Sequence, residues 1–371
     1  MSKKDKNTDP LLCRRNKVGG QAVLEGVMMK SGERVCLAVR KPDGQIQTED
    51  STFVSVRKKS KFLALPIIRG VVNFVESMIM SFKILSRSAE MLGVEEQESK
   101  FEKWLREKFG ASIMAVVMPI SVILGLALSV GLFIFLPTTA TSLLERIFGA
   151  LPSWAKGIIE GVLKLVIFIV YLLLVSLMPD IKRTFQYHGS EHKTIACYEK
   201  GLELTVENVR TQRRFHPRCG TSFMIVMILI SIAVGMLIPW EWADVNVRIL
   251  NILIRTGFKL LLVPLVCGIG YEFLMYAGKH DNFIIRALSA PGLWMQRITT
   301  KEPDDSMIEV AIAATKGALP DEFPKESELE SDESTDEVKD NGHVPTQDAF
   351  DEANGERASQ NDSGEGQSAA E

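Results

Sequence analysis

The sequence predicts a mainly α-helical, polytopic membrane protein with about four transmembrane helices, an interfacial amphipathic helix and a small cytoplasmic α+β portion. Three observations lead to this fold class: four long apolar runs, an uneven distribution of positive charge, and short alternating segments near the N-terminus. The chain is only 46% hydrophobic overall, a value that soluble proteins also reach. The clustering of the apolar residues into long runs, and not their total number, therefore indicates a membrane protein.

Each apolar run approaches the length of about 20 residues that a helix needs to cross the hydrocarbon of a bilayer. The first run has no charged residue in 25 positions, and the third ends in a pair of tryptophans, which are enriched at membrane interfaces. The second and fourth runs carry a few charged residues and are less clean. The expected spans are Ser112–Leu136, Gly157–Met178, Ser222–Trp240 and Phe258–Ala277.

Positive charge sets the expected orientation, because lysine and arginine are retained on the cytoplasmic side. The segment 179–221 between the second and third runs holds eight Lys and Arg residues, whereas 137–156 and 241–257 hold two each. We therefore expect a multi-pass protein of the cell membrane, with both termini and the central loop in the cytoplasm and the lipid bilayer as its surroundings.

The N-terminal part is expected to lie outside the membrane. Residues 34–40 and 51–56 alternate apolar and polar side chains around a Pro-Asp-Gly turn, which predicts a small β-hairpin or meander. In residues 61–85, Arg69, Asn73 and Glu76 share one helical face, which favours an interfacial helix with its polar stripe toward the cytoplasm. A spanning helix is the alternative, and it would separate the glycine-rich segment from the central loop.

The two ends of the chain are predicted to be flexible. Residues 1–17 are polar and basic, without the apolar core of a cleaved signal peptide. Residues 302–371 hold 21 acidic and 4 basic residues, and from about Ala318 onward the composition is typical of disorder. The expected organisation has eight parts. They are a basic leader (1–17), a glycine segment with a hairpin (18–60), interfacial and charged helices (61–111), spans 1–2 (112–178), a His/Cys loop (179–221), spans 3–4 (222–277), a membrane-surface segment (278–317) and an acidic tail (318–371).

The central loop contains the residues most suited to chemistry. His188-Gly189-Ser190-Glu191-His192 fits H-x-x-E-H, in which two histidines one helical turn apart bind one zinc ion. Glu191 is then the candidate catalytic general base, next to a water that the metal activates. Gly189 and Ser190 weaken a helix, so a turn that leads into a helix is an alternative.

His216 and Cys219 lie in the same loop and compete for the third ligand position. Imidazole and thiolate are the usual ligands of zinc, so zinc or another divalent metal is the expected cofactor. The alternative is that these histidines cap helices or contact lipid phosphates. The five cysteines are odd in number and dispersed, which argues against a disulfide framework.

Three further polar residues, Glu25, Glu76 and Arg69, are candidates for a supporting role. Glu25 and Glu76 are additional ligands or hydrogen-bond partners, or are paired to a neighbour such as Arg69. Glu272 is an acid within the fourth run, and such residues are functional candidates by default, although a position near the end of a span also allows snorkelling.

Several blocks of the sequence resemble a known family. VGGQAVLEGVMMK, PIIRGVVNFVES, FQYHGSEHKTIACYE, LTVENVR, HPRCGTSF and PGLWMQRITTKEPDD are similar to the YqhQ-like bacterial membrane proteins. The resemblance runs from about Gly19 to Ala314 and excludes the acidic tail. It implies a membrane protein described as a predicted metal-dependent enzyme, without an established substrate, and it includes the His188, Glu191, His192, His216, Cys219 and Glu25 positions.

Two functions remain open from the sequence. One is a zinc-dependent hydrolase that acts on a lipid headgroup or a polypeptide at the membrane face. The other is a non-catalytic membrane assembly factor or scaffold, with a structural metal or none, that binds a membrane protein partner. In this case the acidic tail of the chain would bind a basic partner. A transporter is less favoured because no inverted repeat is visible. No specific nucleic-acid binding is expected, since membrane topology explains the basic residues.

Overall fold

The computed structural model describes residues 14, 17–93, 114–216, 219–239, 248–277 and 282–324. The expected basic leader and acidic tail lie almost entirely outside the described residues. The strands are β1 Val18–Val23, β2 Gly26–Ser31, β3 Arg34–Arg40 and β4 Ile46–Thr52, and two short 3-10 turns follow them at Val56–Lys59 (η1) and Phe62–Ala64 (η2). The helices are α2 Ile68–Met91, α4 Met114–Val130, π-helical η4 Gly131–Phe135, α5 Leu136–Phe148, α6 Ser153–Val175, α7 Pro179–Glu199, α8 Val206–Arg210, α9 Gly220–Gly235, α10 Arg248–Ala277, α11 Phe283–Thr299 and α12 Asp305–Ala318.

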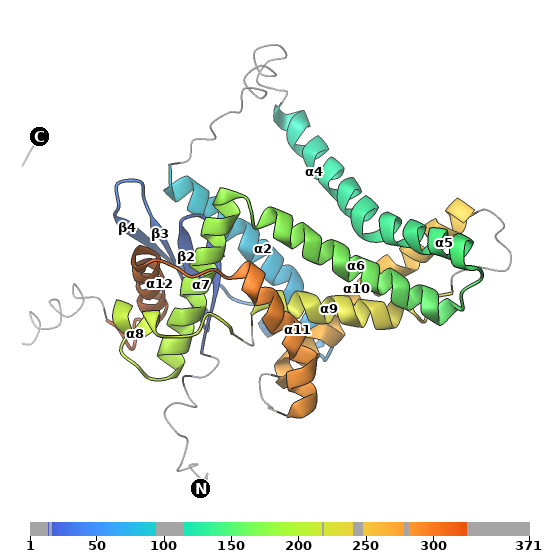
Figure 1. The fold of residues 1–371 in the computed structure, drawn as a ribbon. Helices are drawn as coiled ribbons and strands as arrows, with labels where there is room; N and C mark the ends of the chain where they lie inside the picture. Colours follow the sequence, from blue (N-terminus) through green and yellow to red (C-terminus); the bar gives the residue numbers. More distant parts are fainter. Residues whose placement is uncertain are drawn as a thin grey trace, which may run out of the picture. The chain divides into compact units, whose positions relative to one another are not determined.

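The four strands form an antiparallel meander in the order β1-β2-β3-β4 (Figure 1). The glycine segment, expected only as a compact apolar piece, makes the first hairpin, in which Val23 pairs with Gly26. The second expected strand lies earlier than predicted, at Ile46–Thr52. The meander was therefore predicted, but it contains two more strands than the alternating pattern indicated.

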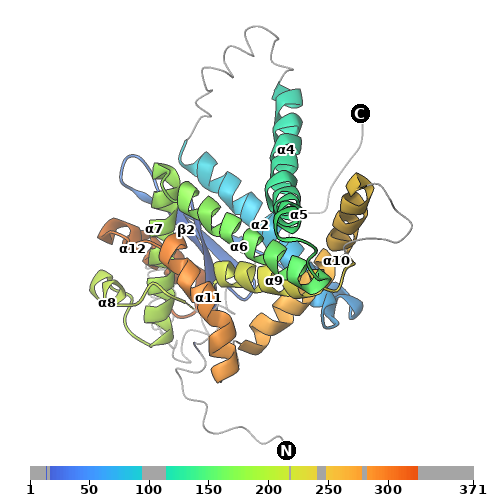
Figure 2. The same cartoon turned by 45° about the vertical axis from the view of Figure 1, so that its right-hand side comes forward.

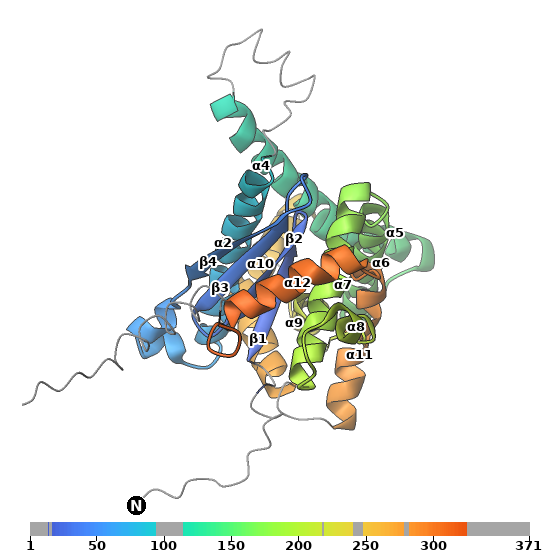
Figure 3. The same cartoon turned by 90° about the vertical axis from the view of Figure 1, so that its left-hand side faces the viewer.

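Both faces of the sheet are covered, which explains why β3 is apolar at successive positions. Val35, Leu37 and Val39 face Ile84 and Met91 of α2 in one core cluster. On the other face α12 lies across β2 and β3 (Figure 3). A Cβ on Gly317 of α12 would lie 2.4 Å from Cys36 Sγ, so this close packing requires glycine there.

Within the described residues, three helices are long and apolar enough to cross a membrane by length and composition. They are Ile120–Phe148, Ser153–Val175 and Leu250–Ala277. The third expected span corresponds to α9, a shorter apolar helix of 16 residues. The part of the chain that the structure describes is thus mainly helical with three candidate spans and one small sheet, and the predicted count of four spans is not established.

The first span does not end at Leu136 as expected. The chain continues through η4 and α5 to Phe148, as one candidate span. The amide of Leu136 donates to the carbonyl of Gly131, a π-type bond that widens the helix just before Pro137. A wider turn accommodates the proline, which lacks an N–H group, so the helix does not break there.

The helix α11 runs continuously from Phe283 to Thr299, although it contains Pro291 and Gly292. A Cβ on Gly292 would lie 2.8 Å from Ser222 Cα, so the glycine lets α11 contact α9. A further expectation is corrected: the central segment 179–221 was expected to be a loop, yet about half of it is the 21-residue helix α7.

Candidate metal centre

The residues of the H-x-x-E-H pattern lie in the middle of a regular helix. α7 begins with a proline at its N-terminus, where the missing N–H costs nothing, and continues without interruption past His188 and His192. The alternative of a turn at Gly189 is therefore not observed. A Cβ on Gly189 would lie only 2.0 Å from the carbonyl oxygen of Lys301. Glycine is needed here for the close approach of residues 299–303 to α7.

The helix brings both histidines to one cysteine. Among the described residues, one ligand atom from each of His188, His192 and Cys219 lies within 4.8 Å of the others. His188 Nε2 is 3.2 Å from Cys219 Sγ, and the two imidazole centroids are 4.4 Å apart. Ligand atoms of a tetrahedral zinc site lie about 3.3–3.6 Å apart, from Zn–N bonds of ~2.0–2.1 Å and Zn–S bonds of ~2.3 Å. Small side-chain movements are sufficient to fit the ion.

Backbone carbonyls fix the orientation of both imidazoles. His188 Nδ1 lies 2.9 Å from the carbonyl of Thr299, and His192 Nδ1 lies 2.6 Å from the carbonyl of Arg214. A carbonyl oxygen only accepts, so each Nδ1 carries a proton and each Nε2 carries a free lone pair. Burial also lowers the pKa of His192, which favours the neutral form that binds metals. This arrangement is typical of metal-ligating histidines.

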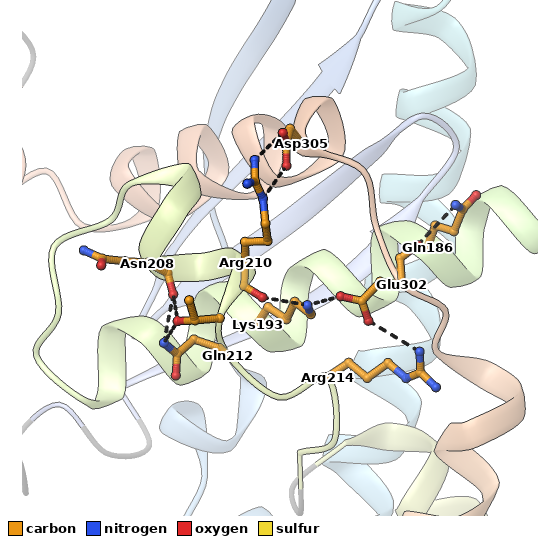
Figure 4. Close-up of polar contacts among 9 residues, drawn as sticks. Gln186, Lys193, Asn208, Arg210, Gln212, Arg214, Glu302 and Asp305 are labelled. Carbon is orange, nitrogen blue, oxygen red and sulfur yellow. Dashed lines mark hydrogen bonds and ion pairs between the residues drawn. The ribbon is translucent and has the colours of Figure 1, made fainter.

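An ion-pair network holds the segments that carry these two carbonyls (Figure 4). Lys193, 4% exposed, donates to the carbonyl of Arg210 at 3.0 Å and pairs with Glu302. The Arg214 guanidinium approaches the other oxygen of Glu302 at 3.5 Å. Lys193 therefore connects α7 to both of the segments that orient the histidines.

We predict that Lys193→Met lowers zinc affinity by about 10-fold to 100-fold, the usual effect of losing a group that positions metal ligands. The readout is a zinc competition titration with a chromophoric chelator on the detergent-purified protein. The matched control is Arg210→Gln, which removes an exposed ion pair with Asp305 in the same network and is expected to change the affinity less than about twofold. Equal affinities for the Lys193 variant and the wild type would contradict the positioning role.

His216 lies beside the cluster, but it is not one of the three grouped residues. Its ring centroid is 5.6 Å from that of His192, and its Nε2 is 3.6 Å from Glu199 Oε2. The buried Gln296 accepts from the backbone amide of His216 and donates to its carbonyl. Of the two sequence candidates for the third ligand, the geometry thus brings Cys219 into the group. Cys219 also caps α9, where its sulfur accepts from the Thr221 amide.

Glu191 is buried next to this cluster, against the sheet. Glu191 is 5% exposed. Its side chain packs against Gly20 of β1, where an added Cβ would lie 2.9 Å from Glu191 Cγ. The backbone amide of Ala22 donates to the carboxylate, while Oε2 has no hydrogen-bond partner. Burial raises the pKa of Glu191 to about 7, and the nearby His188 opposes this rise. A buried carboxylate oxygen without a partner indicates a missing ligand or water.

The three supporting candidates have separate contacts. Glu25 follows β1 with a φ of 48° and forms a two-bond ion pair with Arg183 of α7 at 2.5 Å. Glu76 accepts from the Ser55 hydroxyl and the Val56 amide at the first 3-10 turn, and Arg69 pairs with Glu272 of α10. The polar stripe of α2 thus contacts other parts of the protein. Glu25 alone of the three contacts α7.

Comparison with known proteins assigns the chain to a family. The family model described as protein of unknown function (DUF1385) matches residues 65–321. The chain belongs to this family. "Uncharacterized protein YqhQ" of Bacillus subtilis (strain 168) is 35% identical over 299 residues, which cover 79% of this chain and 89% of that protein. The resemblance to YqhQ-like proteins is confirmed, and no solved structure matches the chain.

Sequence reasoning missed the groups that orient the ligands. The carbonyls of Thr299 and Arg214 are backbone atoms, so no side-chain pattern reveals them. Gln296 was not singled out, although it is fully buried and also donates to Ser222 at 2.9 Å. Its block PGLWMQRITTKEPDD was among those that carried the family resemblance. That block was the available signal that residues 291–305 belong to the site.

Proposed function

We propose that the protein is a zinc-dependent hydrolase of the membrane face, with His188, His192 and Cys219 as its metal ligands. The observation that carries this proposal is the pair of Nδ1 contacts to backbone carbonyls. Two independent chain segments hold the imidazoles so that both Nε2 lone pairs face the same thiol. Histidines that only cap helices or contact lipid phosphates have no need for this convergence.

Three protein ligands favour catalysis over a purely structural role. Structural zinc sites are usually closed by four protein ligands, whereas catalytic sites use three and keep one position for water or substrate. A zinc ion in such a site lowers the pKa of bound water to about 7. The protein would contribute two imidazole nitrogens, the Cys219 sulfur and largely buried surroundings.

Glu191 is the proposed general base. One of its oxygens is fixed by the Ala22 amide, and the other is buried without a partner. A carboxylate held in this way by one oxygen is suited to accept a proton from a water molecule through the other. The Gly20 position supports this role, since a larger residue in β1 would displace the Glu191 side chain.

The substrate is proposed to be amphiphilic. The cluster lies between α7 and the N-terminus of the apolar helix α9, and α7 directly follows a candidate span. The excess of lysine and arginine in 179–221 supports a cytoplasmic location for this side of the protein. A lipid headgroup or a membrane polypeptide at the cytoplasmic surface fits that position.

A structural metal in a membrane scaffold is the second candidate, and one observation favours it. His216 lies next to His192, with 5.6 Å between ring centroids, and rotation of its side chain away from Glu199 would supply a fourth ligand. The two functions differ in whether an external ligand can reach the metal.

Cobalt substitution distinguishes the two candidates. We expect the Co(II)-loaded wild type to show thiolate-to-cobalt absorption and to change its visible spectrum when azide or a hydroxamate is added. His216→Ala should bind cobalt equally well and respond in the same way. Glu191→Gln should also retain the metal, while losing function in a deletion strain that the wild-type gene complements.

The opposite pattern would support the scaffold. In a closed four-ligand site, azide leaves the wild-type spectrum unchanged, and His216→Ala loses metal or becomes sensitive to azide. Full complementation by Glu191→Gln would remove the base from the hydrolase proposal.

A further inference from the structure

The outward-facing side of α2 is apolar. Large side chains recur along it at the i, i+3, i+4 and i+7 positions of one helical stripe. Five of them are 42–71% exposed: Val75, Met78, Ile79, Phe82 and Leu85. The buried Ile84 and Met91 pack against the sheet from another face of the helix. Contiguous exposed apolar surface of this kind marks a contact with a membrane or with another protein.

Charged side chains of α2 turn toward the protein beside this stripe. Glu76 accepts from the Ser55 hydroxyl at 2.8 Å and from the Val56 amide at 2.7 Å. Arg69 pairs with Glu272 of α10 at 2.5 Å. A helix on a water-exposed surface places its charged residues outward and its apolar residues inward. The reverse arrangement in this part of α2 indicates that its outer face meets an apolar medium.

A strap, residues 54–67, extends the stripe to a candidate span. It exposes Phe62 and Leu65, and its Arg57 donates to the Tyr271 hydroxyl of α10 at 3.2 Å. α2 itself contacts α10 through its N-terminal half and the sheet through its C-terminal half (Figure 2). Tyr271 lies about 9 Å along the axis from the end of α10. In a span centred in the bilayer, this depth is near the boundary between headgroups and hydrocarbon.

Three exposed lysines of this surface are unpaired. Lys59 and Lys61 lie on the strap, and Lys83 follows Phe82 in α2. Within the part of the chain that the structure describes, none of the three ammonium groups has a hydrogen-bond or ion-pair partner. The strap contains no acidic residue. Lysine side chains lay their methylene groups on apolar surface and extend the ammonium group toward polar surroundings, so an anionic layer beside the apolar stripe is complementary to them.

We propose that the apolar stripe of α2 and the strap together dock on anionic phospholipids of the surrounding bilayer. The apolar side chains enter the boundary between headgroups and acyl chains, and the three lysines pair with headgroup phosphates. A second copy of the chain is a poorer occupant, because a twofold contact sets the same unpaired lysines against each other. This surface is independent of the proposed zinc chemistry.

Hydrogen exchange of the strap, followed by mass spectrometry, tests the proposal on the full-length protein in nanodiscs. We expect strap amides to exchange at least about fivefold more slowly in phosphatidylglycerol than in phosphatidylcholine, because each lysine at an anionic surface strengthens the contact by about that factor. The triple variant Lys59→Gln, Lys61→Gln, Lys83→Gln should remove this difference. In phosphatidylcholine it should exchange like the wild type, which excludes a folding defect as the cause.

The matched control is the triple variant Lys41→Gln, Arg213→Gln, Lys316→Gln, which removes the same charge from other parts of the protein. It should keep the difference between the two lipids. Equal exchange of the wild type in both lipids, or loss of the difference in the control, would overturn the lipid surface. So would protection that arises only in nanodiscs holding two chains, a result that would assign the surface to a second copy.

Discussion

His192→Ala is expected to reduce bound zinc from about one ion per chain to less than about 0.1. Zinc held by protein ligands at neutral pH contributes roughly 10–16 kcal/mol in structural sites, and this requires the full ligand set. His188→Ala and Cys219→Ser should have the same effect, because each removes one of three convergent ligand atoms. The measurement is inductively coupled plasma mass spectrometry on tag-free protein purified in detergent.

The matched control is His343→Ala, which removes a histidine of the acidic tail and keeps the three ligands. It should retain about one zinc per chain. Loss of zinc from His192→Ala together with unchanged secondary structure by circular dichroism would assign the effect to ligation. Wild-type protein that stays free of metal even after zinc is supplied would contradict the site.

Gly189→Ala is expected to destabilise the protein by at least about 3 kcal/mol, at the upper end of the overpacking range. The added methyl group would lie 2.0 Å from the Lys301 carbonyl oxygen, a rigid backbone atom that cannot move aside as a side chain does. The variant must separate α7 from residues 299–303, and that separation also removes the Thr299 carbonyl from His188. We therefore expect a lower melting temperature and weaker zinc binding together.

The control for this prediction is Gly235→Ala near the end of α9. A Cβ at that position meets nothing within 4 Å, so alanine should be neutral or stabilise the helix by up to about 1 kcal/mol. Thermal melting of both variants in the same detergent makes the comparison. A Gly189→Ala protein that melts with the wild type would show that α7 and residues 299–303 are not packed as described.

The sequence predicted that His188 and His192 lie together better than it predicted the helix that carries them. The i, i+4 spacing of His188 and His192 was visible because it needs only one helical turn. Gly189 argued against a helix on propensity, but propensity is a weak prior, and the close approach of Lys301 explains why glycine occurs there. Tertiary contacts of this kind cannot be seen in a single sequence.

The limits of sequence reasoning were similar at other elements. Glycine-rich residues 18–23 did not alternate clearly, yet they form β1, where Gly20 provides space for Glu191. Pro137 and Pro291 both lie within continuous helical segments, and a π-turn directly precedes Pro137. Three of the four expected apolar runs correspond to candidate spans within the described residues, because length and composition alone define such a span. Their ends depended on local packing, which composition does not record.

X-ray absorption at the zinc edge of the reconstituted wild type tests the central claim most directly. We predict one sulfur at about 2.3 Å, two imidazole nitrogens at about 2.0–2.1 Å and one further light scatterer without imidazole features, as in an open three-ligand site. His216→Ala should give the same spectrum. A third imidazole that disappears in His216→Ala would establish a closed structural site, and a zinc shell without sulfur would contradict the assignment of Cys219.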